Sequence, residues 1–151
     1  MSLVVNNKSV AINFGQHFVY SAKFDSIFEK GMSLVDKTAQ YLDGKGRKQA
    51  KSLKSPLSVI YITESMRLTS RLLSLSSWLL SLRKLRTDGV SIRNAIQIRD
   101  DLKLKRFGHV SHIKHFDKLP QEFQELIIDS YKLSQQVNCI DRALRTNSYC
   151  E

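Results

Sequence analysis

The segment from Pro56 to Arg86 constrains the fold more than any other part of this chain, because no glycine or further proline interrupts it before Gly89. Ser55 and Pro56 form the usual pairing of a helix N-cap with a first-turn proline. At about 1.5 Å per residue, a helix of this length extends roughly 45 Å. Such a helix is too long for a compact mixed fold and is typical of a helical bundle.

Two stripes run along this predicted helix. The first has the alternating spacings of three and four residues found in the seam of a bundle helix, and it consists of Leu57, Tyr61, Glu64, Leu68, Arg71, Leu75, Trp78, Leu82 and Leu85. The second stripe lies on another face and consists of Val59, Ile62, Met66, Leu73 and Leu80. Further apolar residues widen the arc at Ile60, Leu72 and Leu79.

An apolar surface this wide needs partners on more than one side of the helix. Other helices of the chain can cover one side, and the remaining side predicts a second subunit in a two-fold homodimer. The residues that we expect in the core or in the dimer interface are Leu68, Leu75, Trp78, Leu79 and Leu82.

Neither a membrane span nor a secretory signal is expected. The longest uncharged run of the segment, 72–82, has 11 residues, whereas a bilayer requires roughly 20. The first residues lack a basic region followed by an apolar core and a cleavage site. We therefore expect a location in a reducing cytoplasm.

The length of 151 residues predicts a single domain, 1–151, with one hydrophobic core. Hydrophobic residues make up 42% and charged residues 25% of the chain, as in soluble globular proteins. Two cysteines, Cys139 and Cys150, are too few for a disulfide framework or a metal knuckle. We expect Cys139 to be a small apolar filler within a helix.

Positive charge is concentrated in the middle of the chain. The net charge is +10, and residues 44–118 hold 17 Lys or Arg against 5 Asp or Glu. Five of these cations lie between Lys45 and Lys54, in what we predict to be a flexible connection. This charge has three interpretations: a nucleic-acid contact, an acidic protein partner, or a solvated lysine-rich loop.

The patterns predict an N-terminal arm over 1–20, a first helix over 21–43 and the long helix over 55–87. A short helical segment is expected over 91–106 and a last helix over 119–145. Gly44 is expected to end the first helix in the left-handed conformation. Together these elements predict an all-α, antiparallel three-helix bundle with one long central helix and a short extra helical segment.

Signals of enzymatic chemistry are scarce. The run 44–48, GKGRK, follows a predicted helix and lacks the spacing of a phosphate-binding loop. His109, His112 and His115 are interpreted as surface residues of a loop, because Gly108 argues against the helix that a shared metal would need. Glu64 is interpreted as a structural ion-pair partner within the bundle. We therefore predict no enzyme, no metal and no cofactor.

The sequence resembles a known family in several strings that follow one another in the right order and spacing. The most specific are YLDGKGR at 41–47, ESMRLT at 64–69 and SWLL at 77–80, and LPQEFQELIIDS at 119–130 supports them. These strings are similar to those of the regulators of CtrA degradation (RcdA), helical proteins of alphaproteobacteria formerly of unknown function. The resemblance covers roughly residues 20–145.

The resemblance implies a homodimeric three-helix bundle that acts as an adaptor of the ClpXP protease in cell-cycle control, in the cytoplasm and at the cell pole. It implies contact with ClpX, with other adaptors and with protein substrates, and no chemistry by the adaptor itself. The charged residues that match its motifs and are candidates for partner binding are Asp43, Arg47, Glu64, Arg67 and Arg71. Lys48, next to Arg47, is a further candidate, whereas we favour the structural interpretation for Glu64. The alternative from another class is a basic helical nucleic-acid-binding protein.

Overall fold

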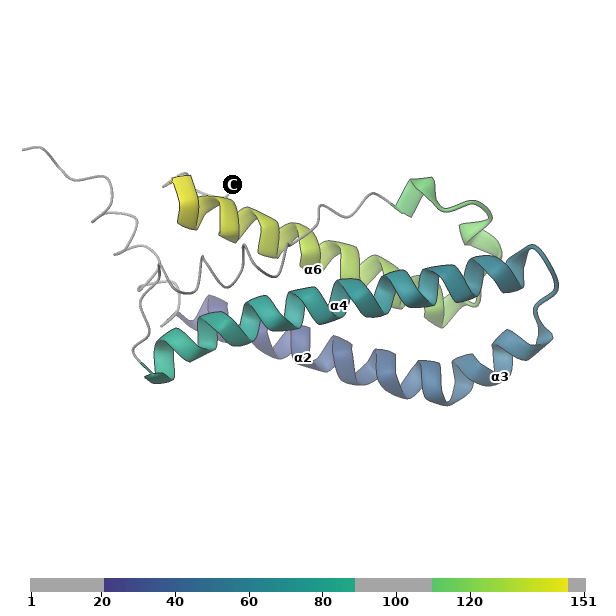
Figure 1. Ribbon diagram of the computed structural model, residues 1–151, viewed down its shortest axis with the longest axis horizontal. Helices are drawn as coiled ribbons and strands as arrows, with labels where there is room; N and C mark the ends of the chain where they lie inside the picture. Colours follow the sequence, from purple (N-terminus) through teal and green to yellow (C-terminus); the bar gives the residue numbers. More distant parts are fainter. Residues whose placement is uncertain (1–20, 89–109, 147–151) are drawn as a thin grey trace, which may run out of the picture.

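The computed structural model describes residues 21–88 and 110–146 (Figure 1). Within these two ranges the chain forms four α-helices and two short 3₁₀-helices and contains no strand, which confirms the all-α prediction. The predicted arm over 1–20 and the predicted helical segment over 91–106 lie outside the described residues.

The first helix, α2, spans Ala22–Asp43, where the sequence predicts 21–43. Ser21 is its N-cap, and the Oγ of Ser21 accepts a hydrogen bond of 3.2 Å from the backbone N–H of Phe24. This bond satisfies one of the N–H groups that have no partner within the first turn.

A separate helix, α3, spans Lys45–Ser52, so the prediction of a flexible connection in this region is wrong. Gly44 joins the two helices with φ −110° and ψ −104°, which is not the predicted left-handed conformation. The first helix therefore ends at Asp43 as predicted, and the chain turns at Gly44 directly into α3. Sequence patterning misses α3 because Ala50 is the one residue in it with an apolar side chain.

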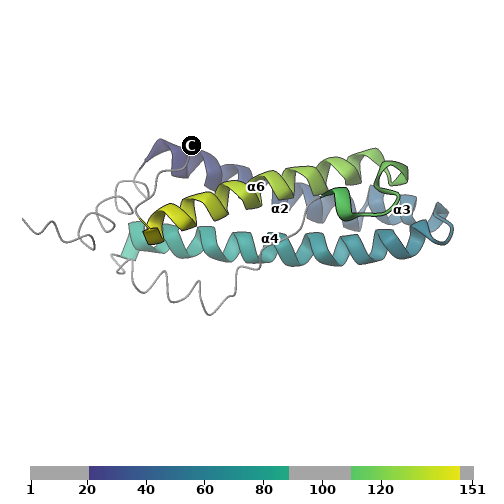
Figure 2. The same ribbon diagram turned by 90° about the horizontal axis from the view of Figure 1, so that it is seen from above.

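The two remaining long helices are α4, Leu57–Asp88, and α6, Gln121–Thr146, for which the sequence predicts 55–87 and 119–145. Between them, two 3₁₀-helices, η1 at Val110–His112 and η2 at Phe116–Lys118, lie near the start of α6 (Figure 1). In the turned view of Figure 2, α2, α4 and α6 lie lengthwise beside one another.

The helix directions correct the antiparallel prediction. Contacts between α4 and α6 advance together along both helices, from Tyr61 with Phe123 to Trp78 with Asp141. These two helices are therefore parallel, and Figure 1 shows α2 running against both. Short loops force consecutive helices to be antiparallel. In the sequence, α4 and α6 are separated by residues 89–120, far more than a short loop, so α6 is free to begin at the same end as α4.

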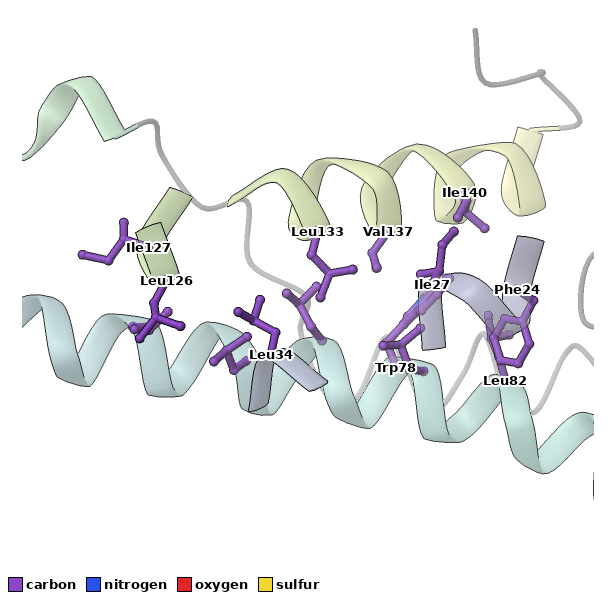
Figure 3. Packing of buried hydrophobic residues seen from close by; sticks show 14 of the residues in the cluster. Phe24, Ile27, Leu34, Trp78, Leu82, Leu126, Ile127, Leu133, Val137 and Ile140 are labelled. Atoms are coloured by element: carbon purple, nitrogen blue, oxygen red, sulfur yellow. The ribbon is translucent and has the colours of Figure 1, made fainter. Parts of the chain in front are cut away.

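The hydrophobic core lies between α2, α4 and α6, which contact one another in all three pairs. Figure 3 shows Phe24 and Ile27 of α2 packed with Trp78 and Leu82 of α4, close to Ile140 of α6. Burial of such apolar side chains supplies most of the free energy that holds the helices together.

A cluster of aromatic residues fixes α3 against α2 and α4. Tyr41 donates a hydrogen bond of 2.8 Å from its hydroxyl to the Oε1 of Gln49, and its ring stacks on Phe123. Gly46 lies so close to these rings that a Cβ would come within 2.8 Å of the carbonyl oxygen of Tyr41 and of the hydroxyl of Tyr61. Real Cβ contacts of that length do not occur, so α3 requires glycine at this position.

We expect the substitution Gly46→Ala to lower the free energy of unfolding by about 1–3 kcal/mol, as overpacking does in other cores. The loss occurs although alanine favours a helix over glycine by about 1 kcal/mol. Urea unfolding followed by circular dichroism measures it. Lys48→Ala, on the exposed side of the same helix, is the control, and equal stabilities of the two variants would contradict the close contact.

Candidate functional site

An exposed apolar stripe runs along α4. Its five side chains retain between 49% and 69% of their accessible surface, and they are Val59, Ile62, Met66, Leu73 and Leu80. Large apolar side chains seldom lie so exposed in a row along one helix of a monomeric protein. These are the residues of the second stripe predicted from the sequence, and we call them the α4 stripe.

The α4 stripe lies opposite the core. Val59, Met66, Leu73 and Leu80 are spaced by seven residues, and Ile62 lies three residues after the first of them. Leu68, Leu75 and Leu82 share the same spacing but are displaced by about 160° around the helix, at about 100° per residue. These leucines are at most 5% exposed. Within residues 21–88 and 110–146, one side of α4 is therefore covered by α2 and α6, and the stripe on the other side is exposed.

Hydroxyl groups on the exposed face of α4 add little polarity to it. Thr69 Oγ1 donates to the carbonyl oxygen of Ser65 at 2.8 Å, and Ser77 Oγ donates to that of Leu73 at 2.9 Å. Such bonds to the preceding turn use the donor of each hydroxyl within the helix itself. The small side chains would also let a second helix approach closely.

All five residues expected in the core or in a dimer interface lie in the core of this chain. Leu68 and Leu79 have no exposed surface, and Trp78 is 3% exposed. The indole N–H of Trp78 donates to the Oδ1 of Asp141 at 3.3 Å. Leu75 and Leu82 complete the set on the same side of α4.

The residues proposed for partner binding fall into three places. Asp43, Arg47 and Lys48 are exposed around the junction of α2 and α3, where Arg47 Nη1 lies 3.9 Å from Asp43 Oδ1. Arg67 projects from α4 with 64% of its side chain exposed. Arg71 is 1% exposed, and the structure therefore does not place it on a surface that a partner could reach.

Arg71 crosses the interior from α4 to α6. Its Nη1 donates to the Oγ of Ser130 at 2.7 Å, and its guanidinium lies 3.8 Å from the ring centre of Tyr131. Burial lowers the pKa of Arg71, while Tyr131 and Glu64 act in the opposite direction. A charge in the interior needs such polar and aromatic neighbours, so Arg71 ties the two parallel helices together.

Glu64 lies in the interior beside this arginine. It is 3% exposed, and its Oε1 accepts a hydrogen bond of 2.8 Å from Nη1 of Arg67. The pair joins a buried carboxylate to an exposed guanidinium on the same side of α4. This arrangement agrees with the structural interpretation of Glu64 made from the sequence.

The histidine and cysteine residues form no site in the described part of the chain. His112 and His115 are exposed in η1 and before η2, and His109 lies outside the described residues. Across residues 21–88 and 110–146, no group of three metal-binding side chains is found. Cys139 is partly buried in α6. No helix in these ranges is both long and apolar enough to cross a membrane.

Comparison with known families and solved structures identifies the family of the chain. A family model described as a protein of unknown function (DUF1465) matches residues 15–151. The crystal structure of RcdA from Caulobacter crescentus CB15 is 34% identical, covers 87% of this chain and 98% of that one, and superposes with a TM-score of 0.66. None of the curated proteins compared with the chain matches it. The chain belongs to the family of RcdA, the regulators of CtrA degradation.

We expect Arg71→Ala to lower the free energy of unfolding by about 3 kcal/mol, because it removes the hydrogen bond to Ser130 and leaves a cavity between α4 and α6. Arg71→Met keeps most of the volume and should cost less. Urea unfolding compares both with Lys84→Ala, an exposed residue of the same helix. If the Arg71→Ala variant were as stable as the wild type but failed to bind a partner, Arg71 would be a partner-binding residue and not a structural one.

Proposed function

We propose that this protein is a non-enzymatic adaptor that regulates proteolysis by ClpXP in cell-cycle control, located in the cytoplasm and at the cell pole. Membership in the RcdA family, over nearly the whole chain, is the observation that carries the proposal. An adaptor raises the effective concentration of a substrate at the protease by holding both at once. The exposed residues Asp43, Arg47, Lys48 and Arg67 are candidates for these contacts.

The proposed working unit is a homodimer formed through the α4 stripe. From Val59 to Leu80 the stripe extends about 32 Å, at about 1.5 Å per residue. A second copy of the same helix offers a surface of equal length and polarity, as a two-fold interface requires. Burial of five large apolar side chains from each subunit would supply the driving force.

The spacing of the stripe favours an antiparallel pairing of the two α4 helices. Its outer and inner apolar positions are symmetric about Thr69 and Ser70, so Met66 would face Leu73 of the second copy and Val59 would face Leu80. A parallel pairing would instead place Lys84, next to the stripe, against its own copy. Like charges that face each other are unfavourable, and among the described residues of α4 no exposed acidic side chain offsets this lysine.

We expect Leu73→Glu to convert the dimer into a monomer at micromolar concentration, because two carboxylates would be buried in the interface. The double variant Met66→Lys/Leu73→Glu should dimerise again, since the antiparallel pairing brings each lysine to a glutamate of the other subunit. Multi-angle light scattering gives the mass, and Ala39→Glu on the exposed side of α2 is the control for added charge.

Three outcomes would contradict this model of the dimer. A wild-type protein that is monomeric would remove the dimer altogether. An unchanged mass for Leu73→Glu would place the interface elsewhere. A monomeric double variant would overturn the antiparallel pairing, because a parallel pairing sets lysine against lysine and glutamate against glutamate.

The adaptor role is tested by degradation of a response-regulator substrate by purified ClpXP, with and without this protein and the other adaptors. We expect faster degradation when the protein is present, and we expect the protein to be retained with ClpX in a pull-down. The effect should pass through an optimum, because excess adaptor separates substrate and protease onto different copies. No retention and no change in rate would refute the proposal.

The alternative, a nucleic-acid-binding protein, has support from one observation. Arg47, Lys48 and Lys51 are exposed together on α3. Binding to phosphates would weaken steeply as salt rises, so binding to duplex and single-stranded DNA at low salt decides it. Absence of binding to both would exclude this alternative.

A further inference from the structure

A groove runs along the bundle between α2 and α6. Two adjoining cavities of about 530 Å³ and 430 Å³ share Lys37 and Asp129 and together form this groove, which we call the α2–α6 groove. Its floor includes the core residues Leu34, Leu126 and Leu133. No residue of α4 lines it, so it is a different surface from the α4 stripe.

The two walls of the groove carry opposite charge in its middle part, where Lys37 of α2 and Asp129 of α6 line both cavities. Lys30 and Lys37 stand on the α2 side, and Glu125 and Asp129 stand on the α6 side. At one end, Lys45 of α3 and Glu122 of α6 bridge the groove with an ion pair of 2.9 Å. At the other end α2 carries both Glu29 and Lys30, and α6 carries Lys132.

The remaining charges of the walls do not pair with each other. Opposite charges on adjacent helices normally form ion pairs when their side chains can reach each other across the groove. Yet within residues 21–88 and 110–146, Lys45 with Glu122 is the one ion pair among the residues that line the groove. The groove therefore keeps Lys37 and Asp129 on its walls, where a third element could pair with both.

We propose that the α2–α6 groove binds an amphipathic helix of a partner protein. The apolar face of that helix would lie on the leucines of the floor and on the aliphatic stems of the lysines. One of its edges would carry Lys or Arg toward Glu125 and Asp129, and the other would carry Asp or Glu toward Lys30 and Lys37. The groove extends about 21 Å from Glu122 to Gln136, which corresponds to a helix of about 15 residues at about 1.5 Å each.

Charge complementarity selects this occupant over others. A nucleic acid is disfavoured, because the carboxylates of the α6 wall would repel its phosphates. A uniformly acidic or uniformly basic peptide would match one wall and be repelled by the other. A helix with divided charge satisfies both walls, and complementary charge of this kind confers specificity.

The test uses the purified full-length protein and three labelled helical peptides with the same leucine seam. One has a lysine edge and a glutamate edge, one has two lysine edges, and one has two glutamate edges. We expect the peptide with divided charge to bind best in fluorescence anisotropy at low salt, by about fivefold, since partly exposed ion pairs contribute up to about 1 kcal/mol each.

Two variants should reverse this order in a sign-specific way. Lys37→Glu should weaken binding of the divided-charge peptide and strengthen binding of the peptide with two lysine edges. Asp129→Lys should weaken binding of the divided-charge peptide and strengthen binding of the peptide with two glutamate edges. Lys23→Glu makes the same change of charge as Lys37→Glu at an exposed site of α2 outside the groove, and it should leave the order unchanged.

The proposal is overturned if the three peptides bind alike, or if Lys37→Glu and Lys23→Glu have the same effect. It is also overturned if amide shifts on binding map to the α4 stripe, or if groove residues shift with protein concentration alone, which would identify a second copy of this chain as the occupant. The protease takes no part in these measurements, so their result is independent of the degradation assay.

Discussion

The packing of α4 against α2 and α6 along a single side is the contact on which the rest of this structure depends. A helix of 32 residues is longer than either neighbour, and it gives both of them a continuous line of buried leucines. Because α2 and α6 cover one side, the stripe residues on the opposite side, from Val59 to Leu80, stay exposed in the described part of the chain. The exposed apolar stripe follows from this one-sided packing as directly as the core does.

Charged residues within the core side of α4 specify how the helices pair. Arg71 reaches Ser130 and Tyr131 of α6, and a parallel neighbour with these side chains at this level is what the guanidinium requires. Apolar contacts alone are tolerant of a shift along the helix, whereas a buried charge is tolerant of very few positions. We infer that Arg71 fixes the register of α4 and α6.

The sequence predicts the long helices and the two faces of α4 well, because both depend on local periodicity. It fails for α3, whose stability comes from the contact of Gly46 with Tyr41 and Tyr61 and not from an apolar pattern of its own. It also fails for the direction of α6, because direction depends on the path of a long connection. Arg71 could not be assigned from the sequence for a third reason. A charged residue in an apolar seam gives the same sequence pattern whether its side chain is buried within the chain or contacts a partner.

The surfaces described here are separated by the architecture itself. The α4 stripe faces away from the core, and the α2–α6 groove is lined without any residue of α4. Pairing of two copies through α4 would consequently leave one groove open on each subunit. A protein that holds two different partners at once needs two binding surfaces that do not overlap. In this bundle, the α4 stripe and the α2–α6 groove are two such surfaces. In the proposed adaptor, the exposed side of α4 and the groove between α2 and α6 would therefore be available to different partners at the same time.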